Sequence, residues 1–124
     1  MLREVRKLKS DPFAEFLEAE VEEVREGYAR VSGVVKKEFL NIHGTAHGAY
    51  IAALADFALA LAANYDMKRM AINISINFFK GAKEGDKLVA EAEKISGRRT
   101  AFFVIRVKRG DEVISEGTAI TLAV

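Results

Sequence analysis

The sequence of 124 residues predicts an α+β fold in which one long helix lies on an antiparallel sheet. Three observations support this prediction. Residues 49–65 are rich in alanine and leucine, which predicts a helix. Segments of alternating apolar and polar residues follow it, divided by short turns that contain glycine, as in antiparallel strands. Two further strand-like runs precede it. At this length we expect a single domain that spans residues 1–124.

The elements before the long helix can be placed in order. Residues 10–17 begin with a capping residue and have Pro12 at the first helical position, which predicts a short helix that covers one side of the domain. Runs at 21–24 and 28–35, separated by Glu26 and Gly27, predict a hairpin. Residues 36–47 have no clear period, so we expect a loop that leads into the helix.

Four strands are expected after the long helix. The first strand alternates apolar and polar residues, which predicts a half-exposed strand. Its apolar face consists of Ile72, Ile74, Ile76 and Phe78, and its polar face of Asn73, Ser75 and Asn77. Residues 81–86 predict a hairpin turn, residues 96–99 a second turn and residues 109–111 a last hairpin.

The long apolar helix has an alternative interpretation as a membrane span. Its apolar run is shorter than the roughly 20 residues that cross a bilayer, and Asp56 lies near its centre. We therefore predict a buried core helix and no membrane association.

Composition excludes several classes of function. The 19 Lys and Arg residues balance 18 Asp and Glu residues, and a formal charge of +1 gives no field that would gather nucleic acid. The absence of Cys excludes disulfides, thiolate zinc sites and a cysteine nucleophile. Charges begin at Arg3, where a signal peptide needs an apolar core, so a cytoplasmic location is expected.

Two expectations concern stability and assembly. The chain has no Gln and many Glu, Lys and Arg residues, which is typical of proteins from thermophilic organisms. A domain of this size buries only about two thirds of its unfolded surface, so self-association would add stability. We expect a thermophilic homo-oligomer.

Asp56 is the residue that most needs a chemical explanation. On a helical wheel it lies nearly opposite a bulky stripe that should press into the sheet, Tyr50, Leu54, Phe57, Leu61 and Tyr65. Its own neighbours are mostly alanines, and no Lys or Arg lies between Lys37 and Lys68. Either a second helix packs there and a buried hydrogen bond holds the carboxylate, or the small residues make room for a substrate. A carboxylate in a cleft with a raised pKa has the properties of a general base.

The segment just before the helix contains further candidates. Gly48 falls at the helix start, where unpaired backbone N–H groups can stabilise a carbonyl oxygen that develops negative charge. His47 is a candidate for orienting groups by hydrogen bonds. His43 and His47 are four residues apart, but the glycines between and after them predict a loop and no adjacent Glu is present, so we expect no metal and no other cofactor.

With these residues identified, the chain resembles the hotdog-fold acyl-CoA thioesterases of the phenylacetate-degradation (PaaI) type. The resemblance spans most of the chain after about Val21. It is carried by Asn41-x-x-Gly44-x-x-His47-Gly48, then Leu54-Ala55-Asp56, the strand 74–79, Gly85-Asp86 and Gly97-Arg98.

The resemblance implies a curved antiparallel sheet wrapped around the central helix, with homodimers that often pair into homotetramers and active sites at the dimer interface. It implies an acyl-CoA substrate, with Asp56 as general base or nucleophile, the Gly48 N–H polarising the carbonyl, and Asn41 and His47 shaping the loop and orienting water or substrate. Asp56 and Gly48 would come from opposite subunits. Lys80, Arg98 and Arg99 are the nearest matches to the basic residues that hold coenzyme A phosphates in relatives.

Two positions depart from the family pattern, and two other functions stay open. Ala49 replaces a second glycine after His47-Gly48, and Ala71 stands where some relatives place a Ser or Thr that positions water. The alternatives to a thioesterase are a non-catalytic acyl-CoA sensor, which would bind ligand without turnover, and a 3-hydroxyacyl thioester dehydratase, which would hydrate an enoyl-CoA.

Overall fold

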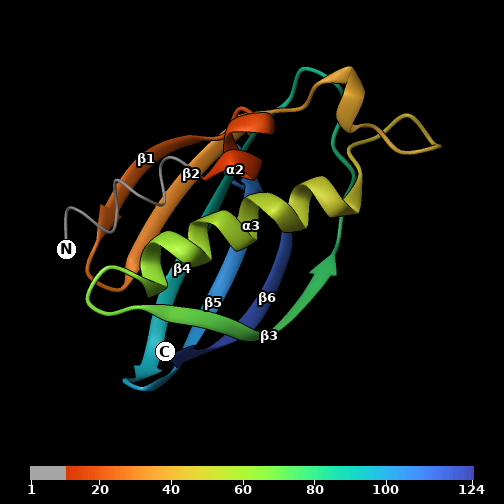
Figure 1. The fold of residues 1–124 in the computed structure, drawn as a ribbon. Helices are drawn as coiled ribbons and strands as arrows, with labels where there is room; N and C mark the ends of the chain where they lie inside the picture. Colours follow the sequence, from red (N-terminus) through yellow and green to blue (C-terminus); the bar gives the residue numbers. More distant parts are fainter. Residues whose placement is uncertain (1–10) are drawn as a thin grey trace.

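In the computed structural model, which describes residues 11–124, a six-stranded antiparallel sheet curves around one long helix (Figure 1). The predicted α+β fold is therefore confirmed. Arg3, on which the expected absence of a signal peptide rests, lies outside the described residues. The elements are α2 (Pro12–Phe16), β1 (Glu20–Arg25), β2 (Tyr28–Val34), the 3-10 helix η1 (Lys37–Phe39), α3 (Gly48–Ala63), β3 (Arg69–Phe78), β4 (Lys87–Gly97), β5 (Thr100–Arg109) and β6 (Glu112–Ala123).

The strand order in the sheet is β1-β2-β4-β5-β6-β3. The three predicted hairpins β1–β2, β4–β5 and β5–β6 are present, but the prediction of a hairpin turn at residues 81–86 is wrong. That segment connects β3 at one edge with β4 in the middle of the sheet, so the two strands are not neighbours. It does turn locally, because the Lys83 N–H donates to the Asp86 carboxylate at 2.8 Å and Gly85 has a φ of +92°. Turn residues mark where a chain bends and not which strand it joins.

The core lies between α3 and the sheet, chiefly against β2, β4 and β5. Tyr50, Leu54, Phe57 and Leu61 of the predicted stripe are all buried. Burying a leucine side chain contributes about 1.5–3 kcal/mol, so this face fixes how the helix is rotated on the sheet. Tyr65 does not continue the stripe, because the helix ends at Ala63. Within residues 11–124, no helix is long and apolar enough to cross a membrane.

The C-terminal end of α3 is held by two polar side chains. Asn64 donates from Nδ2 to the carbonyl of Ala60 at 2.8 Å and accepts from the Arg69 N–H at 2.9 Å. The buried Arg69 guanidinium donates to the carbonyl of Ala63 at 2.6 Å and to Asp66 at 2.7 Å. A cation at this end also favours the helix dipole. These bonds fix the path from the helix into β3.

β3 is an edge strand that is exposed on both faces. Within Arg69–Phe78 only Arg69 is buried and Ile76 half-buried, so the prediction of a half-exposed strand is wrong for the single chain. Its pairing with β6 shifts register between Ala71 and Asn73 and is very close at Gly117, where a Cβ would lie 1.9 Å from the Ser75 carbonyl oxygen. Only glycine fits there. Within residues 11–124, the other edge of β3 has no partner strand.

Candidate active site

Asp56 lies midway along α3, at the wall of an open pocket of about 570 Å³. The pocket runs between the C-terminal half of α3 and the start of β3. Its lining is mostly small or apolar: Leu59, Ala60, Ala63, Asn64, Lys68, Arg69, Met70, Ala71 and Thr121 besides Asp56. Leu59, Ala60 and Ala63, which belong to the stripe of mostly small residues predicted around Asp56, thus line open space.

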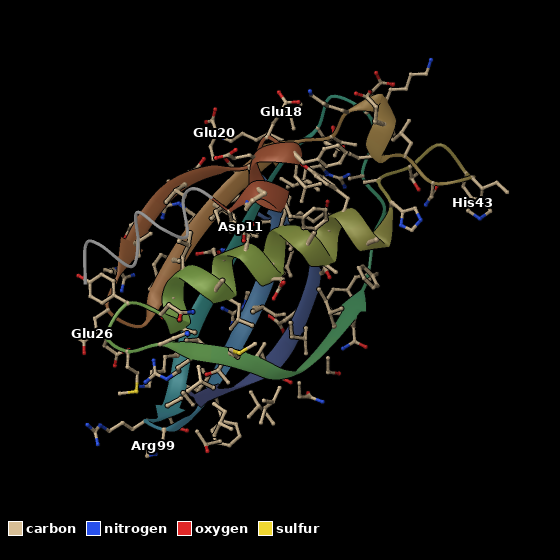
Figure 2. The ribbon with its side chains drawn as sticks, viewed as in Figure 1. Asp11, Glu18, Glu20, Glu26, His43 and Arg99 are labelled. Atoms are coloured by element: carbon tan, nitrogen blue, oxygen red, sulfur yellow. The ribbon has the colours of Figure 1, made fainter. Side chains whose placement is uncertain are left out.

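The environment of Asp56 raises its pKa. Desolvation by the surrounding apolar groups is the larger cause, and the negative charge of Asp11 adds to it. Asp11 is the N-cap of α2 and accepts hydrogen bonds from the amides of Phe13 and Ala14, which hold its carboxylate in place close to α3 (Figure 2). No hydrogen bond or cation from residues 11–124 counters the shift of Asp56. A carboxylate in this state accepts a proton more readily than an ordinary aspartate.

Gly48 is the first residue of α3, as predicted. His47 is the N-cap, and its Nδ1 accepts a hydrogen bond from the amide of Ala49 at 3.0 Å. The amides of Tyr50 and Ile51 bond to the carbonyl of His47. The Gly48 amide is therefore the first free donor of the helix within the described chain, and it opens on a second pocket of about 380 Å³.

Asn41 organises the loop in front of Gly48. Its Oδ1 accepts from the amides of His43 at 2.9 Å and Thr45 at 3.1 Å, and its Nδ2 donates to the Thr45 hydroxyl at 3.0 Å. His43 is exposed near the tip of the loop, which projects beyond the N-terminal end of α3 (Figure 2). Among residues 11–124, no three His, Asp or Glu side chains gather as a metal site. Asn41 itself lines the pocket of Gly48.

The two pockets are separate within one chain. Gly48 and Asp56 are eight residues apart on α3, which corresponds to about 12 Å along the helix axis. The Gly48 pocket meets the C-terminal end of β3 at Phe78 and Phe79, and the Asp56 pocket meets its N-terminal end at Met70 and Ala71. The unpaired edge strand thus connects both halves of the predicted site.

The predicted phosphate-binding residues do not gather at one place. Lys80 lines the Gly48 pocket and pairs with Glu112. Arg98 and Arg99 lie in the turn between β4 and β5, at the opposite end of β3, where the Arg98 carbonyl accepts from Arg69 at 2.8 Å. The resemblance gave all three as one set, and the structure divides them between two ends of the sheet.

The sequence analysis missed several residues that shape these pockets. Lys68 lies at the far end of the Asp56 pocket, and the Phe78 ring lies 3.4 Å from the position a Cβ on Gly48 would take. Asp11 was overlooked as a charge near Asp56. Residues next to a strand start give no periodic signal, and proximity between distant segments cannot be derived from a single sequence. The usable signal was that no Lys or Arg lies between Lys37 and Lys68, so no cation on α3 offsets the charge of Asp56.

The comparison with known families decides the assignment. The thioesterase superfamily model matches residues 43–116, which include His47, Gly48 and Asp56 and extend into β6. The chain belongs to the thioesterase superfamily. Together with the structural neighbours below, this match identifies a hotdog-fold protein of the PaaI type, as the resemblance implied.

Individual relatives agree with this superfamily assignment. The chain is 48% identical over 102 residues to an Archaeoglobus fulgidus protein, over 81% of this chain and 66% of that protein. It is 31% identical over 101 residues to the acyl-coenzyme A thioesterase PaaI of Escherichia coli, over 80% of this chain and 72% of that protein. The alignments thus span about two thirds of the relatives' length.

Two solved structures share the fold. The phenylacetic acid degradation protein PaaI of Thermus thermophilus superposes with a TM-score of 0.90 at 33% identity, over 92% of this chain and 100% of that one. A Streptococcus mutans protein bound to acetyl CoA superposes with a TM-score of 0.80 at 25% identity, over 86% of this chain and 88% of that one.

Proposed function

We propose that this chain is an acyl-CoA thioesterase that hydrolyses a thioester to the free acid and coenzyme A, with residues 1–124 as a single catalytic domain. One observation carries the proposal: the Asp56 side chain is exposed at the wall of a largely apolar pocket, beside an edge of β3 that is unpaired among residues 11–124. The names of the E. coli relative and of the S. mutans neighbour, one a thioesterase and the other bound to acetyl CoA, support the substrate class.

The unpaired edge of β3 supports a homodimer as the active form. When β3 pairs antiparallel with β3 of a second copy about Ile74, Met70 of one copy lies opposite Phe78 of the other. Met70 lines the Asp56 pocket and Phe78 the Gly48 pocket, so this pairing joins the two half-sites. The interface would also cover the exposed strand, which is otherwise open to unwanted pairing.

In the joined site each candidate residue has a role that its position supports. Asp56 takes a proton from a water whose oxygen attacks the thioester carbonyl carbon, or attacks that carbon itself and is released by water. The Gly48 amide of the partner subunit donates to the oxygen as it becomes negative. The C–S bond then breaks, and the sulfur takes up a proton. Asn41 holds the loop, and His47 caps Ala49, which leaves the Gly48 amide free to bind substrate.

A homotetramer, cytoplasmic location and thermophilic origin are further parts of the proposal. Apolar side chains are exposed near one another on neighbouring strands, Ile95 of β4, Phe102 of β5 and Leu122 of β6, and would be covered if two dimers packed together. Light scattering tests the assembly, and thermal unfolding tests the expected high stability.

The deciding experiment is a hydrolysis assay of the purified protein with short, long and aromatic acyl-CoA substrates. Asp56→Asn should lower kcat by orders of magnitude with the fold retained, since it preserves shape and removes the base. Asp111→Asn, in the exposed turn before β6, is the matched control and should keep full activity. Tight coenzyme A binding without turnover would favour the sensor, and hydration of an enoyl-CoA would favour the dehydratase.

A further inference from the structure

The connection between β3 and β4, residues 79–86, forms part of the wall of the Gly48 pocket. Lys80 and Gly81 line this pocket together with Thr45 and Gly48. The connection runs beside the segment between β2 and α3 (Figure 1), and a Cβ on Gly81 would lie 3.7 Å from the Thr45 side chain. The path of this connection therefore helps to set the shape of the pocket on which the Gly48 amide opens.

The same connection holds the backbone just before α3. The amide of the buried Ala46 donates to the carbonyl of Ala82, which is itself fully buried, at 2.8 Å. The next amide, that of His47, donates to the carbonyl of Phe39 in η1 at 2.7 Å. The chain is thus held at two successive residues before Gly48, once by the connection and once by η1. A displacement of Ala82 would be passed to the Gly48 amide over two residues.

Arg109, the last residue of β5, ties the connection to the sheet. Its Nη1 donates to the carbonyl of Gly81 at 2.8 Å and to the Asp86 carboxylate at 3.3 Å, and its Nη2 donates to Glu112 at 2.7 Å. Glu112 also pairs with Lys80. One guanidinium thus joins two points of the connection to the start of β6. Its planar, forked donors suit three acceptors at fixed positions, which a lysine ammonium would not reproduce.

The Gly85-Asp86 pair, one of the motifs on which the resemblance rests, belongs to this arrangement. The Asp86 carboxylate accepts from the Lys83 amide at 2.8 Å besides its bond from Arg109. The backbone of the pair exchanges two hydrogen bonds with Val35, which directly follows β2: the Val35 amide donates to the Asp86 carbonyl at 2.9 Å, and the Gly85 amide donates to the Val35 carbonyl at 2.8 Å. The connection is therefore fixed to β2 at one end and to Arg109 along its length.

We infer that Arg109, together with Asp86, is a positioning residue that holds the Gly48 amide where the thioester oxygen becomes negative. Arg109 does not itself line the Gly48 pocket, so it acts through the connection and the Ala46 amide and touches no substrate. An oxyanion donor works when it is held in place before the reaction, and a misplacement of about 1 Å can lower a rate about 100-fold. This inference rests on the proposed function, since it concerns the oxygen of a bound thioester.

A double-mutant cycle between residues 109 and 48 tests this role. Arg109→Ala should lower kcat for acyl-CoA hydrolysis about tenfold, because the oxyanion donor is displaced. Gly48→Pro keeps the start of α3 but has no amide hydrogen, so in that background Arg109→Ala should lower kcat by no more than about twofold. Arg106→Ala, on the same strand, is the matched control, because Arg106 pairs with Glu116 at 2.7 Å and has no contact with the connection. It should leave kcat unchanged in both backgrounds.

Two kinetic results would overturn the assignment. One is a loss of about tenfold from Arg109→Ala in both backgrounds, because Arg109 would then act on the fold or on another part of the site. The other is an unchanged kcat when Arg109→Ala is made in the wild-type background. If Arg109→Ala does not fold, Arg109→Lys takes its place in the same cycle, since lysine keeps the charge but reaches fewer of the three acceptors.

Amide hydrogen exchange tests the contact without turnover. The Ala46 amide should exchange about tenfold faster in Arg109→Ala than in the wild type, because the connection that accepts its bond is then held less firmly. Arg106→Ala should leave this rate unchanged. Equal rates at Ala46 in the wild type and in Arg109→Ala would reject the positioning role. A wild-type protein that hydrolyses no acyl-CoA would contradict the proposed function, while the exchange rates would still decide whether Arg109 holds the Ala46 contact.

Discussion

In the proposed site, the charge of Asp56 serves catalysis and carries a cost to stability. Because the folded-state pKa lies above the unfolded value, the protonated form is favoured in the folded protein. The contribution of Asp56 to stability is therefore greatest at a pH below its unfolded-state pKa, and it decreases as pH rises through its folded-state pKa.

This pH dependence predicts how Asp56→Asn changes the thermal stability of the protein. The variant lacks the charge, so its Tm should exceed that of the wild type at neutral pH, although its activity is lost. The difference should shrink as pH is lowered toward 4 and below. Thermal unfolding at several pH values measures it. A lower Tm for the variant at pH 7 would show that a bond to the carboxylate, and not its desolvation, dominates.

Asp11 provides a separate prediction on the pH dependence of catalysis. Its charge helps to raise the pKa of Asp56, and an asparagine keeps the N-cap of α2. Asp11→Asn should move the acidic limb of the kcat/KM profile to lower pH, because Asp56 then ionises earlier. Glu15→Gln, which removes a charge from the exposed side of the same helix, should leave the limb in place. If the acidic limb of the kcat/KM profile stays at the same pH in Asp11→Asn, the charge of Asp11 does not contribute to the pKa of Asp56.

The free amide of Gly48 can be removed without removing the helix. Proline is well accommodated at the first position of a helix, and the preceding His47 has an extended ψ of 136°, which a following proline requires. Gly48→Pro should lower kcat about 100-fold, since it deletes one oxyanion donor. Gly48→Ala places a similar Cβ against Phe78 but keeps the amide, so it should retain most of the activity. Equally low kcat values for the two variants would show that the added side-chain volume at residue 48, and not the missing amide, causes the loss of activity.

At the scale of elements, the N-cap of α3 connects stability with the site. His47→Ala removes the acceptor of the Ala49 amide and should cost about 1 kcal/mol of folding free energy. His47→Asn should restore most of that loss, because asparagine is a good N-cap. If His47→Asn restores both activity and stability, the imidazole of His47 contributes to activity only as the N-cap of α3. Restored stability without activity would indicate a direct contact with substrate or water. Chemical denaturation and measurement of kcat on the same samples distinguish the capping role from a direct contact with substrate or water.

The elements also show what a sequence can and cannot predict. The order of elements follows from local periodicity, and the stripe Tyr50, Leu54, Phe57 and Leu61 is buried because helical spacing alone brings these side chains together. The place of β3 next to β6 is a long-range pairing with no local signal, which is why residues 81–86 were predicted as a hairpin turn. The exposure of β3 was predicted wrongly for a related reason, since no element among residues 11–124 covers the strand beyond its pairing with β6.

For the whole molecule, the proposal depends on the separation of Gly48 and Asp56, which line different pockets. Gly48 and Asp56 were predicted from residue chemistry and lie in different pockets of one chain. Both stay predictions, and in the proposed dimer their combination depends on how two copies pair, which the open edge of β3 suggests and the sequence alone does not. Lys68 and the division of the basic residues between the two ends also depend on the assembled fold.

Subunit complementation tests this arrangement directly. Asp56→Asn retains a functional Gly48, and Gly48→Pro retains a functional Asp56, so each homodimer should be nearly inactive. When the two variants are unfolded, mixed and refolded together, about half of the dimers are mixed, and each mixed dimer holds one site with both residues intact and one with neither. The mixture should therefore regain about a quarter of the wild-type activity. Variants refolded separately and then assayed together serve as the control. If the site lay within one chain, no combination of these subunits would contain an intact pair, and the refolded mixture would stay as inactive as its components.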